Sequence, residues 1–450
     1  MSRTGGQDRK ASGIEWLGDI PSSWTVAEIK LTHQVTLGKM LQSTPTTDAD
    51  ILLPYLRAAH IPPTGLRLAD PKEMWFNPKE RAQLTLKKGD VVVVEGGMGG
   101  YGRCDIVPED ILDWGFQNSI NRLRPKDGNC GSYTKYLLQT AREAGYIDVL
   151  CSISTMPHLT AEKLGAIRLP LPPTREQWDI ARFLDRETAK IDALIAKQEQ
   201  LISTLREDRT VTITKAFTEG FDQDCDMDDQ GIWLGISPRH WRRARLRDVI
   251  TTIDSGVSVN GADTPTGPGE VGVLKTNCVT GGDGIFRPEA NKTVLAEELS
   301  RVACPVRADT IIVNRANTAE LVGSAGYVKQ DAPDLFLSDL LWSVSVCGVN
   351  PEFIHLWMQS SVYRTQVRAW SSGFNPSMQK LAKASLRSFV ISIPPASEQA
   401  EIVNRVSEQT RRLDRLLTKA GEVIATLREY RAALIADAVT GKIDVQGAVA

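Results

Sequence analysis

The stretch PPTREQWDIARFLDRETAKIDALIAKQEQLISTLREDRTVTITKAFTEG, residues 172–220, has a second copy in this chain, PPASEQAEIVNRVSEQTRRLDRLLTKAGEVIATLREYRAALIADAVTG at residues 394–441. A shift of 222 positions (398 − 176) places Glu176 on Glu398 and Gln177 on Gln399. The same shift aligns the run TLRE at residues 204–207 with an identical run at residues 426–429. A repeat of this length indicates that the chain is built from two related halves.

Each copy has the pattern of one long helix. The paired prolines permit a helix immediately after them, and Thr174 with Gln177 forms a capping box for the first turn. Apolar residues then recur at helical spacing close to a heptad, with polar residues elsewhere. They are Ile180, Leu184, Ile191, Leu194, Ile195, Leu201, Ile202 and Leu205 in the first copy, and Ile402, Val406, Leu413, Leu416, Leu417, Val423, Ile424 and Leu427 in the second.

We therefore predict two long helices, at residues 172–220 and 394–441. Roughly 44 residues at about 1.5 Å each give a rod of about 65 Å. A single amphipathic helix of that length cannot bury its apolar stripe on itself, whereas two copies in one chain can bury theirs against each other. The alternative, two ordinary surface helices, is disfavoured by the duplication and by the length.

The composition bounds the class of protein. With 450 residues, 42% of them hydrophobic, the chain is long enough for two or three domains with substantial cores. No apolar run approaches the length of a membrane span, and the first ten residues carry no apolar signal segment. The seven cysteines are scattered and odd in number, which favours reduced thiols in a cytoplasm over a disulfide framework or a zinc site.

The formal net charge is −2, and the charge is unevenly spread. A near-neutral total does not exclude a nucleic-acid ligand, but it requires any basic surface to be local. An acidic linker is predicted at residues 221–231, where no basic residue interrupts Asp222, Asp224, Asp226, Asp228 and Asp229.

The two halves share a frame as well as a helix. Each opens with a related lead-in, GIEWLGDIPSSW at residues 13–24 and GIWLGISPRHW at residues 231–241. Short β-branched runs, Gly/Pro breaks and a few helical segments follow, which is the pattern of an α+β fold. We predict two α/β domains in tandem, residues 14–171 and 232–393, with tails at residues 1–13 (disordered) and 442–450. A shared frame with divergent loops indicates two readers of different ligands.

No motif for chemistry stands out. Residues 97–102 (GMGGYG) match GxGxxG, but no helical pattern follows as a dinucleotide site requires, so a tight glycine loop is the better interpretation. There is no GxxxxGK[ST] phosphate loop and no Asn-Pro-Pro-aromatic stretch of an amino-methyltransferase. The five histidines stand apart, without metal-ligand spacing. We predict no catalytic residue, no metal and no cofactor in this chain.

Several polar groups could instead contact nucleic acid. Arg242 and Arg243 lie in a dense arginine cluster suited to phosphate, although a solvated edge strand would look the same. Arginine and lysine suit guanine, and asparagine and glutamine suit adenine. For each such residue ordinary surface polarity is the alternative. The candidate base readers are Arg57, His60, Gln117, Asn118, Lys275, Asn277, Asn314, Arg315 and Asn317.

The layout resembles the specificity subunit of type I restriction-modification enzymes. The resemblance rests on Trp16-Leu17-Gly18 followed by Ile20-Pro21 and Trp24, on PPTREQ at residues 172–177, on the second copies of both, and on NRANTAELVG at residues 314–323. It covers nearly the whole chain. The departures are small: the second lead-in lacks the acid of the first, and Ala396 replaces the capping threonine.

The resemblance implies two target-recognition domains held apart by an antiparallel coiled coil of the two helices. Each domain would bind one half of a split sequence in double-stranded DNA. Two methyltransferase subunits, which carry S-adenosylmethionine, would dock on the helices and methylate adenine. Restriction subunits with ATP- and Mg-dependent translocase motors would join them. The chain itself would be a cytoplasmic DNA reader without catalytic activity or a membrane partner.

Two other functions remain open from the sequence. One is a non-enzymatic coiled-coil scaffold that carries two carbohydrate- or peptide-binding domains. The other is an enzyme whose site leaves no signature in the sequence. Salt-sensitive, sequence-selective DNA binding would exclude the scaffold, and activity of the purified chain alone would reveal the enzyme.

Overall fold

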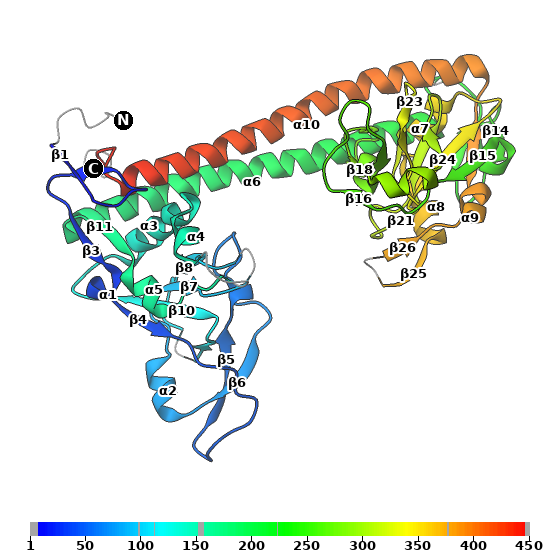
Figure 1. Cartoon of the computed structure of the whole chain (residues 1–450). Helices are drawn as coiled ribbons and strands as arrows, with labels where there is room; N and C mark the ends of the chain where they lie inside the picture. The colour runs from blue at the N-terminus through cyan, green and yellow to red at the C-terminus, as the bar shows by residue number, and fades with distance from the viewer. Residues whose placement is uncertain are drawn as a thin grey trace. The chain divides into compact units, whose positions relative to one another are not determined.

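The computed structural model describes residues 8–97, 100–111, 113–151, 157–222, 224–375 and 378–445. The chain divides into two compact units: the first comprises Met1–Lys197 and Ile424–Ala450, and the second comprises Gln198–Val423. Both units mix helices and strands (Figure 1), which confirms the predicted fold class of two tandem mixed domains with long helices. Each long helix contributes a segment to both units.

The first unit is built on a four-stranded antiparallel sheet in the order β4-β10-β7-β8. The VVVV run of β7 is fully buried, because successive side chains alternate between two cores. Val91 and Val93 face a core that includes α3, and Val92 and Val94 face a second core. The strands are β4 (His33–Leu37), β10 (Ile120–Pro125), β7 (Val91–Val94) and β8 (Cys104–Ile106), and α3 is Gly131–Glu143.

A second sheet in this unit has the order β6-β5-β9 and consists of β6 (Lys72–Phe76), β5 (Ile51–Leu56) and β9 (Gly115–Phe116). β5 and β9 are parallel, so they end at the same edge of the sheet. The remaining elements are β1 (Arg9–Ala11), β2 (Asp19–Pro21), β3 (Thr25–Glu28), α1 (Ile29–Thr32), η1 (Ala58–His60), α2 (Pro78–Gln83), α4 (Tyr146–Cys151), α5 (Ala161–Ala166) and β11 (Arg168–Leu171).

The second unit repeats this plan with different sequences. Its four-stranded sheet has the order β15-β24-β20-β22. In chain order both four-stranded sheets therefore read 1-4-2-3. The strands are β15 (Ile250–Ser255), β24 (Leu341–Val346), β20 (Ile311–Asn314) and β22 (Ala325–Tyr327).

The second sheet of this unit, β16-β18-β17-β23-β19, also contains one parallel pair, β17 with β23. Its strands are β16 (Gly261–Ala262), β18 (Asn291–Val294), β17 (Gly272–Leu274), β23 (Ala332–Phe336) and β19 (Pro305–Val306). The other elements are β12 (Met227–Asp229), β13 (Ile236–Pro238), β14 (Arg242–Arg245), η2 (Leu246–Asp248), η3 (Thr276–Cys278), η4 (Ala296–Arg301), β21 (Ala316–Asn317), α7 (Pro351–Trp357), α8 (Ser361–Trp370), β25 (Ser372–Asn375), β26 (Met378–Lys380), α9 (Lys383–Ser388) and β27 (Val390–Ile393).

The two long helices are α6 (Thr174–Thr218) and α10 (Ala396–Val439), within the predicted ranges. In the first unit their segments share one apolar core, with Ile180, Leu184 and Ile191 of α6 near Leu434 and Ile435 of α10. In the second unit the shared core contains Ile213, Ala216 and Phe217 of α6 together with Ile402, Val403 and Val406 of α10.

Within the first unit the two segments run antiparallel. The end of α10 lies at the start of α6, because Gly441 packs on Trp24 and the indole Nε1 of Trp24 donates to Glu176 over 3.1 Å. Further along α6, Asp192 meets Arg431, which precedes that end of α10. Within the second unit, Gly220 after α6 lies against Trp241 and Glu398 at the start of α10, so these segments are antiparallel as well.

The predicted apolar stripe is only partly buried. Leu194 and Leu201 of α6 are 48% and 44% exposed, and their repeat equivalents in α10, Leu416 and Val423, are 46% and 41% exposed. A heptad pattern does not distinguish a residue that faces the partner helix from a neighbour that faces outward. Exposure at equivalent positions of both helices indicates that the repeat preserves this outward apolar surface.

The predicted capping box is wrong in its use of Gln177. Its side-chain Nε2 donates to the carbonyl of Pro172 and to Asn129, and its Oε1 accepts from the backbone N–H of Cys130. Gln399 repeats this arrangement, donating to Pro394 and accepting from Asn350. The repeated glutamine thus ties each long helix to the domain before it, where Cys130 and Asn350 are the N-cap residues of α3 and α7.

The predicted tail and linker contain structure. In the first unit β1 pairs with β2, with Arg9 opposite Pro21, although residues 1–13 were expected to be disordered. In the second unit β12 pairs with β13, with Met227 opposite Pro238, inside what we expected to be an acidic linker. Both lead-ins therefore begin with the same small hairpin. In the predicted C-terminal tail, Val445 is buried in the first unit's core, and residues 446–450 lie outside the described residues.

All seven cysteines are free thiols in the structure. Among the described residues, no helix is both long enough and apolar enough to span a membrane. The same residues contain no group of three or more His, Cys, Asp or Glu side chains arranged to hold a metal ion.

Candidate nucleic-acid interface

The ends of two parallel strands bring four candidate residues together in the first unit. Arg57 follows β5 directly, and Gln117 follows β9 directly. Leu56 is in register with Phe116, and the backbone N–H of Gln117 donates to the carbonyl of Leu56 over 2.9 Å. His60 closes the turn η1 after Arg57, and Asn118 follows Gln117. We call this group of strand ends the first reading edge.

Arg57 is the basic side chain of the first reading edge. Its guanidinium pairs with Asp70 over 2.8 Å, and the side chains are 24% and 80% exposed respectively. The Nε of Arg57 is buried and has no hydrogen-bond partner within the described residues. The guanidinium is partly exposed and pairs with a single carboxylate, which leaves Arg57 suited to a bidentate acceptor such as a guanine edge.

His60 is not available as a base reader. The ring is 3% exposed and packs edge-on to Trp114, with ring centroids 5.7 Å apart. Its Nδ1 accepts from the backbone N–H of Arg57 over 3.2 Å, and burial lowers its pKa. A neutral ring that accepts this hydrogen bond shapes the turn that carries Arg57. His60 thus positions Arg57 rather than contacting a ligand.

Sequence reasoning missed Lys39, which also lies at the first reading edge. Its backbone N–H donates to Phe116, and its carbonyl accepts from Asn118, so β4 continues alongside the end of β9. The ammonium pairs with Glu80 and lies over the ring of Phe76. The preceding Gly38 approaches the carbonyl of Gln117 so closely that a Cβ would lie 2.2 Å from the carbonyl oxygen. This glycine was the feature of the sequence that could have indicated a close approach of two backbones here.

The second unit has the corresponding strand end after β17, where Lys275 leads into η3. Lys275 pairs with the carboxylate of Asp263, and the side chains are 36% and 92% exposed respectively. Asn277 lies in η3 and is exposed. Lys275 therefore occupies in the second unit the place that Arg57 occupies in the first. We call the group of Lys275, Asn277 and Arg315 the second reading edge; Arg315 is described in the next paragraph.

The candidate residues at the end of β20 and after it differ in whether their side chains can reach a ligand. Asn314 is fully buried: its amide contacts the carbonyl of Leu321, and its backbone bonds Gly323 and Ser324, so it closes a turn rather than reading a base. Arg315 lies 5.9 Å over the ring of Trp342, and its backbone N–H donates to the carbonyl of Leu340, directly before β24.

The last candidate after β20 is Asn317, which is half-buried on β21 and lies opposite Gln379 of β26. Arg242 and Arg243 are exposed on β14, which pairs with β27 in a separate two-stranded sheet. The structure therefore does not bring these two arginines to the second reading edge. Their setting fits a contact to the phosphate backbone better than a contact to a base edge.

A family model described as "Type I restriction modification DNA specificity domain" matches residues 72–203 and 238–424 of the chain, which contain most of both units. The chain belongs to this family.

Curated relatives agree with the family match. The chain is 25% identical over 321 residues to the type I restriction enzyme EcoBI specificity subunit of Escherichia coli, a match over 67% of this chain and 64% of that protein. It is 21% identical over 447 residues to the EcoKI specificity subunit of Escherichia coli strain K12, covering 95% of this chain and 91% of that protein.

The fold agrees as well. A chain from a solved structure described as "Structural basis underlying complex assembly and conformational transition of the type I R-M system" superposes with a TM-score of 0.61. The identity is 16%, and the match covers 94% of this chain and 99% of the other. At that identity the likeness supports the fold.

Most of the side chains whose pKa is strongly shifted lie in the cores of the two units. Burial lowers the pKa of Arg122 to about 10, and the side chain donates to the carbonyls of Gln83 and Thr85. Burial also raises the pKa of the thiols of Cys104 and Cys278 to about 12. These groups are enclosed and hydrogen-bonded or packed within the protein, which is the arrangement of structural residues rather than of acid–base catalysts in a cleft.

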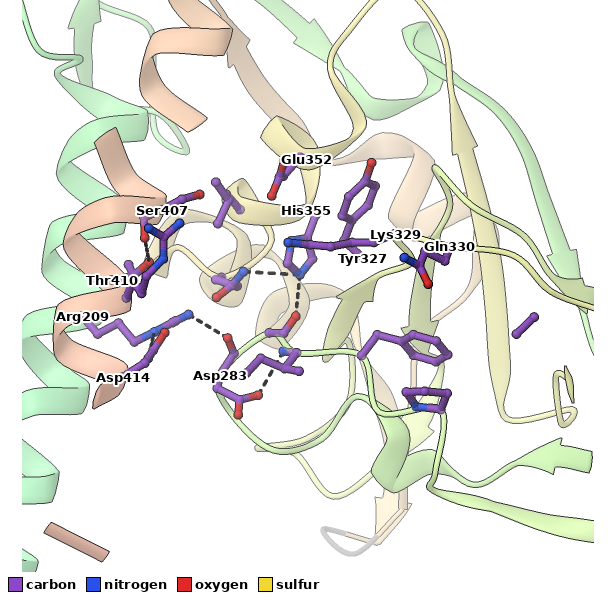
Figure 2. A pocket seen from close by; sticks show the side chains of 18 of the residues that line it. Arg209, Asp283, Tyr327, Lys329, Gln330, Glu352, His355, Ser407, Thr410 and Asp414 are labelled. Atoms are coloured by element: carbon purple, nitrogen blue, oxygen red, sulfur yellow. Dashed lines mark hydrogen bonds and ion pairs between the residues drawn. The ribbon is translucent and has the colours of Figure 1, made fainter. Parts of the chain in front are cut away.

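A pocket of about 710 Å³ lies in the second unit, between the segments of α6 and α10, α7 and the loop at Asp283. Figure 2 shows the side chain of Arg209 extending from α6 between Asp414 and that loop. Its Nε donates to Asp414 over 3.0 Å, and its Nη2 donates to the carbonyl of Asp283 over 2.7 Å. His355 points at the same loop and contacts the carbonyl of Gly284 over 2.8 Å. These contacts join the loop to the helices.

In the first unit, the side chain of Tyr136 occupies the place that corresponds to this pocket. There the hydroxyl of Tyr136 donates to Asp185 over 2.7 Å and contacts Thr188 at 3.2 Å. The repeat carries Asp185 and Thr188 onto Ser407 and Thr410, which line the pocket of the second unit. The pocket thus marks a difference between the units and is not part of either reading edge.

Proposed function

We propose that this chain reads a bipartite site in double-stranded DNA, with one half of the site bound by each unit. Two methyltransferase subunits dock on its long helices and methylate adenine, and restriction subunits with translocase motors join that core. The S-adenosylmethionine, ATP and Mg²⁺ of such an assembly belong to the partner subunits. The chain itself carries out no chemical step.

The observation that carries this proposal is the recurrence of one frame in both units. Each unit has a four-stranded sheet in the same order and a parallel pair that ends at a basic residue, Arg57 in one and Lys275 in the other. The side chains around these strand ends differ between the units. A common frame with different reading residues is what recognition of two different half-sites requires.

The reading edges have the chemistry that sequence-specific contact needs. In the first unit, Arg57, Gln117 and Asn118 combine a guanidinium with two amides at adjacent strand ends. In the second unit, Lys275, Asn277 and Arg315 supply the corresponding groups. Charged donors suit guanine, and paired amide groups suit adenine.

The repeated exposure of apolar residues supports docking of two copies of one partner. Leu194 and Leu416 occupy equivalent positions of α6 and α10 and are both nearly half exposed, and the same holds for Leu201 and Val423. Apolar side chains left exposed in this way are typical of interaction surfaces. Two equivalent surfaces would accept two identical partners. The antiparallel contacts within each unit support a coiled coil that sets the distance between the half-sites.

Methylation mapping tests the proposal. The chain would be expressed with its methyltransferase subunit in a host that lacks the system, and methylated adenines would be mapped across the genome. We expect a single motif with two specified halves separated by a fixed spacer, absent when the chain is omitted. A continuous motif, or methylation that does not depend on the chain, would contradict it.

A further inference from the structure

In both reading edges an aspartate forms an ion pair with the basic residue that directly follows the strand. In the first unit this is the pair Arg57–Asp70, and in the second it is the pair Lys275–Asp263. The basic residue is half-buried in each pair, whereas the acid is 80% or 92% exposed. Each pair therefore joins a mostly exposed acid to a residue that, under the proposed function, contacts DNA.

The two aspartates do not descend from one position of the repeat. Asp70 follows its partner by 13 residues, whereas Asp263 precedes its partner by 12. Asp70 comes after β5 in the chain, whereas Asp263 comes before β17. The same pairing is thus built separately in each unit, which indicates a requirement of the site rather than an inherited contact.

The backbone at Asp70 supports this view. Its φ is +55°, in the left-handed region that non-glycine residues rarely adopt. Its carbonyl faces Nε2 of His60, so the loop is fixed to the turn that carries Arg57. An exposed ion pair is also weak, so a better acceptor can displace it.

We propose that Asp70 and Asp263 are specificity-determining residues that occupy Arg57 and Lys275 until a cognate base displaces them. The idea rests on the proposed function. On random DNA each pair stays closed, because the carboxylate repels phosphate and shields the base reader. On the cognate half-site a guanine edge, which offers two acceptors, replaces the carboxylate. Each aspartate therefore acts against non-cognate sequences more strongly than against the cognate one.

The test measures binding of the full chain, co-expressed with its methyltransferase subunits, to a duplex with the mapped motif and to a scrambled duplex. Asp70→Asn and Asp263→Asn should each tighten binding to the scrambled duplex about two- to fivefold. The salt slope on that duplex should steepen by about one counterion. Binding to the cognate duplex should change less, so discrimination falls. Duplexes scrambled in one half should show that each variant relaxes only its own half.

Matched controls separate this effect from the loss of a negative charge. Asp48→Asn and Asp334→Asn remove an exposed carboxylate from each unit, and neither residue has an ion pair in the part of the chain that the structure describes. They should leave discrimination unchanged. In an Arg57→Gln background, Asp70→Asn should have no further effect on discrimination, because no arginine remains to be released.

Equal effects of the paired and control substitutions would overturn the inference while leaving the proposed function intact. Weaker binding of Asp70→Asn to both duplexes would also overturn it, because the aspartate would then be a support for Arg57. A wild-type complex that binds both duplexes equally would contradict the proposed function itself, and the inference with it.

Discussion

Arg431 donates from Nε to Oδ1 of Asp192 over 2.9 Å and so joins α10 to α6 within the first unit. The second unit contains the same pair with the helices exchanged, since Arg209 of α6 donates from Nε to Asp414 of α10 over 3.0 Å. The shift of 222 positions carries Asp192 onto Asp414 and Arg209 onto Arg431. Each aspartate of one copy thus meets the arginine of the other copy.

The two pairs should contribute unequally to stability. The side chains of Arg209 and Asp414 are 9% and 32% exposed, whereas those of Arg431 and Asp192 are 31% and 53% exposed. Asp414→Asn leaves a buried guanidinium without its carboxylate and should lower the free energy of unfolding by about 1–3 kcal/mol. Asp192→Asn should cost less than about 1 kcal/mol, because solvent screens an exposed pair. Denaturant unfolding of the two full-length variants checks this difference, and equal losses would show that burial does not distinguish the pairs.

Acid should destabilise the chain through His355. Burial lowers the pKa of its ring from 6.5 to about 4. The unfolded chain therefore binds a proton near pH 6.5 that the folded chain does not bind until about pH 4. The free energy of unfolding contributed by this group should fall as the pH drops through that window, by at most about 3–4 kcal/mol, and level off below it.

His355→Gln removes this titration. Unfolding curves for the wild type and the variant should converge as the pH falls from 6.5 to 4, because carboxylates affect both proteins alike. A difference between the two proteins that is constant with pH would show that His355 does not titrate as its burial requires.

Arg242 and Arg243 should contact phosphates rather than bases. Both are exposed on β14, away from the strand end at Lys275. Changing both to alanine should weaken binding to all duplexes and reduce the salt slope by about one to two counterions. Binding titrations at several salt concentrations measure this. Altered base preference with an unchanged salt slope would instead identify them as base readers.

Periodicity and repetition in the sequence were sufficient to predict the long helices. Strong 3.6-residue patterns that recur 222 positions apart identify α6 and α10 to within two residues at each end. The hairpins β1–β2 and β12–β13 were missed because RKA and MDD have three residues each and share none. Their equivalence depends on backbone pairing, which sequence similarity does not report.

The candidate site was harder to predict than the fold. Residue type indicates what Arg57, His60 or Asn314 can bond, but not whether the side chain faces solvent. His60 and Asn314 satisfy backbone groups inside the protein, which is as common a use of a histidine or asparagine as ligand contact. Asp70 and Lys39 reach the first reading edge through loop and strand contacts that no local pattern predicts.

The proposed coiled coil should act as a ruler for the spacer between the half-sites. Each unit contains segments of both helices, so both must be lengthened together. Four residues would be inserted between Lys197 and Gln198 and four between Val423 and Ile424. Four residues add about 6 Å and about 40° beyond one turn, and one base pair adds about 3.4 Å and about 35°.

The lengthened chain should therefore recognise the same half-sites with a spacer about one base pair longer. Methylation mapping of the variant complex checks this. An unchanged spacer with full activity would mean that the helices do not set the distance.

Exchange of one domain tests the central claim most directly. Residues 24–171 would be replaced by the corresponding region of another family member with a different recognition sequence, and the methylated motif of the hybrid complex would be mapped. The account predicts that one half of the motif changes to that of the donor, while the other half is retained. A motif in which both halves change, or neither does, would contradict the assignment of one half-site to each unit.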